Sequence, residues 1–155
     1  MSQLWIFIKY WLPTLVWMCL IFTASSDSHS SEHTSYFFMP LLHWFFPHIP
    51  DQQAEEVHHV FRKCGHFTEY AILALLIRRT LNGAFRPGLP PWSGRLAAAV
   101  VGLAFLYASS DEFHQSFVPT RTPLFSDVLI DTAGGTAGLL GLWAWQRIWK
   151  SRGRT

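Results

Sequence analysis

Residues that could do chemistry gather in the stretch from Tyr107 to Asp131, which reads YASSDEFHQSFVPTRTPLFSDVLID. Its charged or titratable residues are Asp111, Glu112, His114, Arg121, Asp127 and Asp131. One apolar run precedes the stretch and another follows it, so these side chains lie at the ends of two predicted membrane helices. A charged residue at bilayer depth costs about 2.5 to 3.5 kcal/mol on insertion scales, and such residues mostly face the protein interior and serve a function. This stretch is therefore the first candidate site.

Helical spacing predicts an acid/base pair on the first of these helices. Asp111 lies one turn before both His114 and Gln115, at spacings of three and four residues. A carboxylate in this position could fix the tautomer and orientation of the imidazole. Glu112 adds a second carboxylate at the same depth. If the protein is an enzyme, we expect His114 or His66 to be its base or nucleophile and one of these acids to orient it.

The second helix predicts two buried aspartates. Asp127 and Asp131 are separated by four residues, so they share a helix face that continues through the glycines of GGTAGLLG. Glycine lets a neighbouring helix approach closely, which favours a position inside the bundle for both aspartates. The GxxxG sequence from Gly134 to Gly138 is expected to serve packing within the chain.

Cations that could bind an anion come from two other places. Arg121 is held between two prolines in VPTRTP, and arginine binds phosphate or carboxylate in bidentate fashion. The motif RKCGHFTEY opens an earlier apolar segment and places Arg62, His66 and Tyr70 at successive spacings of four, with Lys63 beside them. These residues, with Gln115, Asp127 and Asp131, form the predicted ligand-binding set.

Composition indicates an all-α membrane protein. Of the 155 residues, 50% are hydrophobic and 14% are charged, against about 25% charged residues in soluble domains. We predict one domain, residues 1–155, that forms a bundle of four transmembrane helices. The predicted spans cover about residues 4–22, 61–81, 95–116 and 124–145.

Shorter features divide these spans. Pro13 is expected to kink the first span. A polar loop is predicted over Ala24–Ser35, followed by an aromatic interfacial segment, Tyr36–Pro47, that is too short to cross a bilayer. The second span is preceded by an amphipathic start at Asp51, and a loop rich in glycine and proline is predicted over Arg78–Pro91.

The positions of Lys and Arg predict the orientation. Eight of the twelve flank the loop after the second span or follow the fourth span. By the positive-inside rule both regions, and with them both termini, are cytoplasmic. The polar motifs then meet at the outer end of the bundle.

Several classes of function have little support. No basic run resembles a nucleic-acid footprint, and Cys19 and Cys64 lack zinc or redox spacing. A zinc or manganese site could use His66, His114 and nearby carboxylates, but no HExxH or similar spacing is present, so no metal or cofactor is predicted. The six histidines outside the two motifs, His58 and His59 among them, are expected to be solvated or at headgroup level.

Three blocks resemble the VanZ-like family of bacterial membrane proteins, which is named after a teicoplanin-resistance determinant. They are IFTASS at Ile21–Ser26, RKCGHFTEY at Arg62–Tyr70 and SSDEFHQSFVPTRTPLFSDVLIDTAGG at Ser109–Gly135. The resemblance covers nearly the whole chain. It implies a small four-helix protein of the bacterial cytoplasmic membrane, and in the namesake a low-level tolerance of glycopeptides.

Two functions are therefore carried forward. In the first, the outer polar site binds an anionic, lipid-linked precursor of the cell envelope, with Arg62, Lys63 and Arg121 on phosphate or carboxylate. In the second, the protein is an intramembrane hydrolase or transferase that acts on such a lipid, with Arg121 stabilising developing phosphate charge. A third interpretation makes Asp127, Asp131, Arg62 and Lys63 an ion-pair network that only holds the helices together. The expected partners are membrane lipids.

Overall fold

The computed structural model describes residues 2–26, 30–85, 92–118 and 123–152, and these contain helices and no strand. The elements are α1 (Gln3–Ile6), the π-helix η1 (Phe7–Trp11), α2 (Leu12–Ser26), α3 (Ser30–Phe45), α4 (Asp51–Thr80), the π-helix η2 (Leu81–Phe85), α5 (Gly94–Gln115) and α6 (Phe125–Arg152). The predicted all-α class is confirmed.

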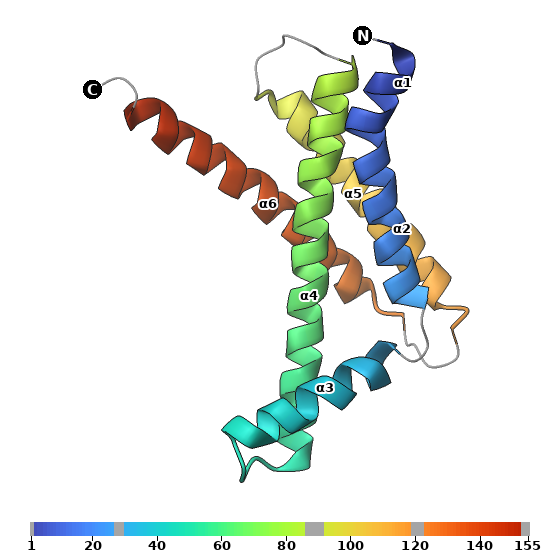
Figure 1. Ribbon diagram of the computed structural model, residues 1–155, viewed down its shortest axis with the longest axis vertical. Coiled ribbons are helices and arrows are strands. Elements are labelled where there is room, and N and C mark those ends of the chain that lie inside the picture. The colour runs from blue at the N-terminus through green and yellow to red at the C-terminus, as the bar shows by residue number, and fades with distance from the viewer. Residues whose placement is uncertain (1, 27–29, 86–91, 119–122, 153–155) are drawn as a thin grey trace.

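The long helices alternate in direction (Figure 1). The continuous rod of α1, η1 and α2 runs beside α4, with α5 packed against both. Helix α6 crosses α4 and α5 near its start, and its last turns leave the other helices. Helix α3 lies across the first turns of α4. Both ends of the chain lie at the opposite end of the molecule from α3.

Pro13 produces a wide turn in the first rod. Because proline has no backbone N–H, it cannot donate to the carbonyl four residues earlier. The preceding residues form the π-helix η1, in which the Leu12 N–H donates to the Phe7 carbonyl. In the same region the Tyr10 carbonyl accepts a hydrogen bond from Thr80 Oγ1 at 2.6 Å. The irregular turn therefore fastens the first rod to the end of α4.

Three predicted boundaries were wrong. Helix α3 begins at Ser30, inside the segment predicted as a polar loop, and it contains Pro40. The second span, predicted over about residues 61–81 with a loop from Arg78, continues as helix through η2 to Phe85, and the Arg78 guanidinium stacks 4.5 Å from the Trp92 ring centroid. The last helix continues past Trp145 to Arg152. There the Trp145 and Trp149 rings lie 5.9 Å apart, a one-turn pairing that supports the final turns.

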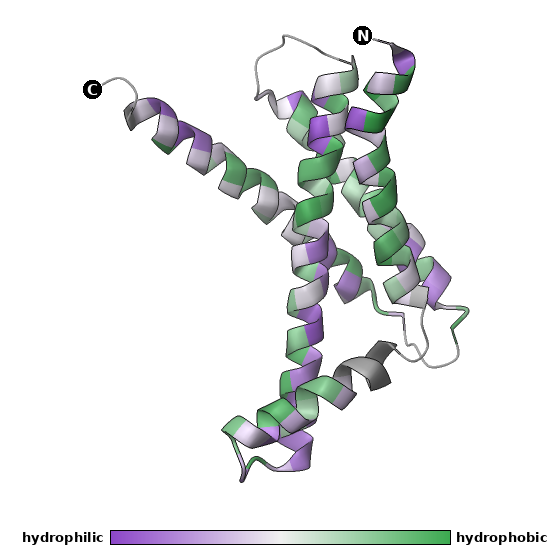
Figure 2. Cartoon of the chain, in the orientation of Figure 1, coloured by the Kyte–Doolittle hydropathy of each residue, from purple (hydrophilic) through white to green (hydrophobic). Residues whose placement is uncertain are grey.

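Hydrophobic residues are spread along the long helices (Figure 2), and they lie on the outside of the bundle as well as in its core. The core contains Tyr70, Leu73, Val100 and Ala108, while many large hydrophobic residues on α1, α2, α5 and α6 are exposed. Among the described helices, two are long and apolar enough to cross a membrane, over Gln3–Ser25 and Gly94–Gln115. The other two predicted spans lie on α4 and α6, which carry most of the charged side chains.

Glycines set the close crossing of α4 and α6. A Cβ on Gly138 would lie 2.7 Å from the Ala71 carbonyl oxygen, and one on Gly134 would overlap the Phe67 carbonyl. Gly135 faces Ala74 and Ala104. These contacts confirm that the GxxxG sequence serves packing within the chain.

We expect Gly138→Ala to destabilise the fold by about 1 to 3 kcal/mol, because the added methyl group overlaps α4. Gly141→Ala is the matched control, since a Cβ there meets nothing within 4 Å. Thermal unfolding in detergent would measure both variants. Equal melting temperatures for the two would contradict the close crossing.

The contact between α3 and α4 should weaken in acid. The His58 ring lies 5.2 Å from the Phe38 ring, and burial, with the nearby charges of Arg62 and His59, lowers the pKa of His58 below its usual value of about 6.5. The unfolded chain therefore binds a proton more readily than the folded chain, so His58 costs stability as the pH falls below about 6.5. We expect unfolding at pH 7.5 and 5.5 to show a smaller acid loss in His58→Phe than in the wild type. An identical loss in the two would exclude this role.

Candidate functional site

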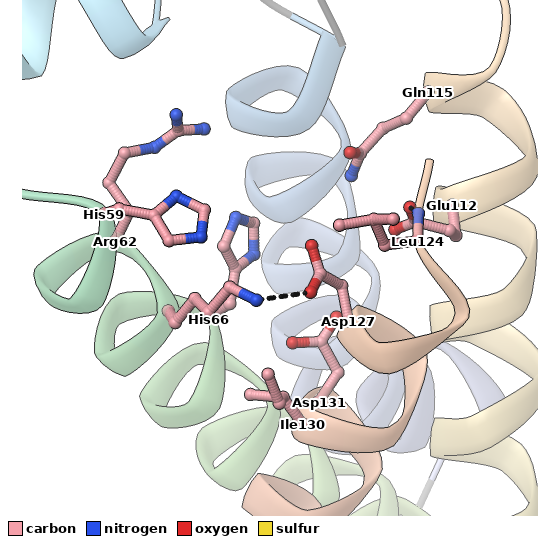
Figure 3. A pocket seen from close by; sticks show the side chains of 10 residues that line it. His59, Arg62, His66, Glu112, Gln115, Leu124, Asp127, Ile130 and Asp131 are labelled. Carbon is pink, nitrogen blue, oxygen red and sulfur yellow. Dashed lines mark hydrogen bonds and ion pairs between the residues drawn. The ribbon is translucent and has the colours of Figure 1, made fainter. Parts of the chain in front are cut away.

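A pocket of about 230 Å³ lies between α4, α5 and α6 (Figure 3). It is lined by His59, Arg62, Lys63, His66, Glu112, Gln115, Leu124, Asp127, Ile130 and Asp131. The motifs that were predicted to meet at one depth therefore do line a single pocket. Of the predicted site residues, seven line it: Arg62, Lys63, His66, Glu112, Gln115, Asp127 and Asp131.

Helix α4 supplies the basic wall. His59, Arg62, Lys63 and His66 follow one another at spacings of three, one and three, so they project from one helix face. The Lys63 ammonium lies 3.0 Å from Asp127 Oδ1, which joins this wall to α6. Both side chains are about one-third exposed, and partial exposure weakens such a pair. This pair holds the two walls together across the pocket.

Carboxylates supply the opposite wall. Glu112 on α5 accepts a hydrogen bond from the backbone N–H of Leu124, just before α6 begins. The Asp127 carboxylate lies in the first turn of α6, where the partial positive charge of the helix N-terminus stabilises an anion. Asp131 follows one turn later and is 5% exposed. The start of α6 therefore presents acidic side chains to the basic face of α4.

A buried polar network lies beside the pocket. Ser25 Oγ at the end of α2 donates to Asp111 Oδ2 at 2.8 Å, and Gln115 Nε2 donates to both partners. Asp111 is 2% exposed. Two neutral donors thus bond to one oxygen, Oδ2, of a buried carboxylate and join α2 to α5. The spacing of Asp111 and Gln115 correctly indicated a shared face.

The structure does not form the predicted Asp111–His114 pair. The His114 ring packs on Phe22, with centroids 4.4 Å apart, and its Nδ1 is buried without a hydrogen bond to any described residue. Asp111 points instead to Ser25 and Gln115, because spacings of both three and four are compatible with a helix contact. Among the described side chains, His114 is therefore not oriented by a carboxylate.

One further predicted ligand residue does not line the pocket, and another lies outside the described residues. Tyr70 is fully buried in the core, with its ring 6.1 Å from that of Tyr107. Arg121 lies outside the described residues. The formal cations in the described lining of the pocket are therefore Arg62 and Lys63 of α4.

Three residues at or near the pocket were not among the predicted site residues. His59 was expected to be solvated and is exposed, but it also lines the pocket, one turn before Lys63. Ser25 was placed in a polar loop but ends α2 against Asp111. Glu69 Oε2 lies 3.5 Å from His66 Nδ1, one turn apart on α4. For His59 and Glu69 the signal was available, because both fall on or beside the helical stripe of Arg62 and His66.

Two apolar grooves flank Trp17, and Glu69 contributes to both. One, of about 490 Å³, is lined by α2 residues and Glu69, and the other, of about 380 Å³, by Phe61, Gly65 and their neighbours on α4. Trp17 Nε1 donates to the Glu69 carbonyl at 3.0 Å and separates the grooves. Since Glu69 also contacts His66, the grooves lie next to the polar pocket.

The described residues contain no group of three or more His, Cys, Asp or Glu side chains placed to hold a metal ion. The suggested site of His66 and His114 is not formed, because His66 lines the pocket and His114 packs on Phe22.

The apolar exterior and the two membrane-length helices, together with the family match reported next, support a helical membrane protein. The chain belongs to the VanZ/LLP1 family, whose model matches residues 10–146. No curated protein and no solved structure matches the chain. The family match confirms the resemblance seen in the three sequence blocks.

We expect Ser25→Ala to destabilise the protein by about 1 to 3 kcal/mol, because it removes a donor from a buried carboxylate. Ser109→Ala is the control, since Ser109 Oγ donates only to the Phe105 carbonyl of its own helix. Chemical unfolding in detergent would compare the two. A Ser25→Ala effect no larger than that of the control would show that the Asp111 network contributes little.

Proposed function

We propose that the chain is a four-span protein of the bacterial cytoplasmic membrane, with both termini cytoplasmic and the pocket towards the outer face. The alternation of helix directions and the shared end of the two termini support this arrangement (Figure 1). The end of the bundle that holds the termini also contains the end of α4, the start of α5 and the end of α6. It therefore carries four arginines, as the positive-inside rule requires: Arg78, Arg79, Arg95 and Arg147. Helix α3, with exposed Tyr36, Phe37 and Trp44, then lies at the outer interface.

The pocket, on this proposal, binds the phosphate-bearing headgroup of a lipid-linked precursor of the cell envelope. The observation that carries it is the basic face of α4, which lines a pocket instead of facing solvent. Arg62 supplies a planar donor group that suits phosphate oxygens, and Lys63 supplies a second charge. Such side chains are costly at membrane depth, which favours a functional reason for their presence.

The apolar grooves support a lipid as the ligand. They are lined mostly by side chains of α2 and α4, which on this proposal border the lipid, and they adjoin the pocket through Glu69 and His66. A hydrocarbon chain in these grooves would leave its headgroup near the basic wall. The pocket and grooves together therefore suit an amphipathic molecule better than a free anion.

Gly65→Leu tests the groove. A Cβ on Gly65 meets nothing within 4 Å, so the leucine fills the groove near Cys64 and Thr68 without a backbone clash. Native mass spectrometry of the protein with long-chain polyprenyl phosphate should show at least a several-fold loss of bound lipid. Gly102→Leu on α5, also in open space, should bind as the wild type does.

Equal retention by Gly65→Leu and Gly102→Leu would overturn the groove as the lipid's position. No retention of any phosphate lipid by folded wild-type protein would overturn the proposed function itself. The charged residues of the pocket would then be interpreted as an ion-pair network that only holds the helices together.

A hydrolase or transferase is the second candidate, and one observation favours it. His66 lines the pocket and its Nδ1 lies 3.5 Å from Glu69 Oε2; the two atoms are not hydrogen-bonded in this structure, but a hydrogen bond that tightens on ligand binding would orient the imidazole as a base. The same mass spectra would detect it as a change in lipid mass that His66→Gln abolishes. Teicoplanin susceptibility of cells that express the chain is the corresponding cellular readout.

A further inference from the structure

The described lining of the pocket carries more negative than positive charge. Arg62 and Lys63 are its formal cations, and Glu112, Asp127 and Asp131 are its carboxylates. With neutral histidines, a headgroup that carried only phosphate would add to this excess. The charges are also segregated, with the cations on α4 and the carboxylates on α5 and α6 (Figure 3).

Asp131 is the least satisfied of these carboxylates. It is 5% exposed, it lines the pocket, and it forms no hydrogen bond or ion pair with any residue in the described ranges. By comparison, Asp127, one turn earlier on α6, forms an ion pair in which its Oδ1 lies 3.0 Å from Lys63 Nζ. Asp111 is buried to a similar degree but accepts hydrogen bonds from Ser25 and Gln115. A buried polar group without a partner costs about 1 to 3 kcal/mol, and more when it is charged.

We propose that Asp131 receives an ammonium group of the ligand, so that the pocket selects lipids whose headgroup carries a primary amine close to its phosphate. This inference rests on the proposed function and names the headgroup class. An ammonium group has three donors and a positive charge, so it satisfies the carboxylate and cancels the negative charge that the phosphate would add to the pocket. The phosphate then faces α4 while the amine faces α6.

The chemistry of the pocket favours an ammonium over the other donors. A hydroxyl group would supply a hydrogen bond but would leave the charge added by the phosphate uncompensated. A metal ion needs several ligands, and the described residues offer no such group. The volume of about 230 Å³ suits a small headgroup.

Three lipids with identical acyl chains provide the test: phosphatidic acid, phosphatidylglycerol and phosphatidylethanolamine. They share the phosphate and differ in carrying no further donor, hydroxyl donors or a primary ammonium. In competition experiments read by native mass spectrometry, we expect the ammonium lipid to be retained about tenfold over the glycerol lipid, which corresponds to about 1.4 kcal/mol. Asp131→Asn should abolish this preference, whereas Glu55→Gln, an exposed carboxylate change on α4, should keep it.

A second comparison uses wild-type protein alone and so does not depend on how Asp131→Asn folds. N-Acetylation of phosphatidylethanolamine removes the amine charge and leaves the phosphate and chains unchanged. We expect the acetylated lipid to lose the preference. Binding of all these phosphate lipids at one level would overturn the role of Asp131 and leave the proposed function standing. Binding of none of them would overturn the role of Asp131, and would overturn the proposed function as well only if the same folded protein also failed to retain polyprenyl phosphate.

Discussion

The structure depends on keeping carboxylates inside a bundle whose outer surface is apolar. Such groups are tolerated at membrane depth only where other parts of the protein or a ligand provide donors. Ser25 and Gln115 provide them for Asp111, and Lys63 provides one for Asp127. Each of these contacts joins two different helices or holds two groups on one helix face. The same contacts therefore supply hydrogen-bond donors to the buried carboxylates and hold the helices together.

The glycines of α6 make that arrangement possible. Gly134 and Gly138 bring α6 against the backbone of α4 at Phe67 and Ala71. This contact places the first turns of α6, with Asp127 and Asp131, opposite the basic residues of α4. The remainder of α6 then leaves the bundle with its tryptophans exposed (Figure 1). The close crossing of α4 and α6 therefore explains both the pocket at the start of α6 and the separation of its last turns from the other helices.

The sequence was sufficient to predict the all-α class and the polar motifs that line one pocket. In a largely apolar chain, charged residues are costly toward lipid and therefore gather inside the bundle. Spacing also correctly indicated the face shared by Asp111 and Gln115. It could not decide between partners on different helices, so the predicted Asp111–His114 pair is replaced by contacts to Ser25 from α2 and to Gln115. The helix ends at Ser30, Phe85 and Arg152 were missed because ring stacking and tertiary contacts extend helices beyond their apolar cores.

The central claim is that the basic face of α4 holds a lipid phosphate inside the bundle. Solid-state NMR of the protein with ¹⁵N-labelled arginine in lipid bilayers can measure dipolar coupling between guanidinium nitrogens and the lipid ³¹P nucleus. The account predicts a coupled arginine signal that disappears in Arg62→Gln and persists in Arg147→Gln, a change at the far end of α6. A coupling spectrum that Arg62→Gln leaves unchanged would contradict it.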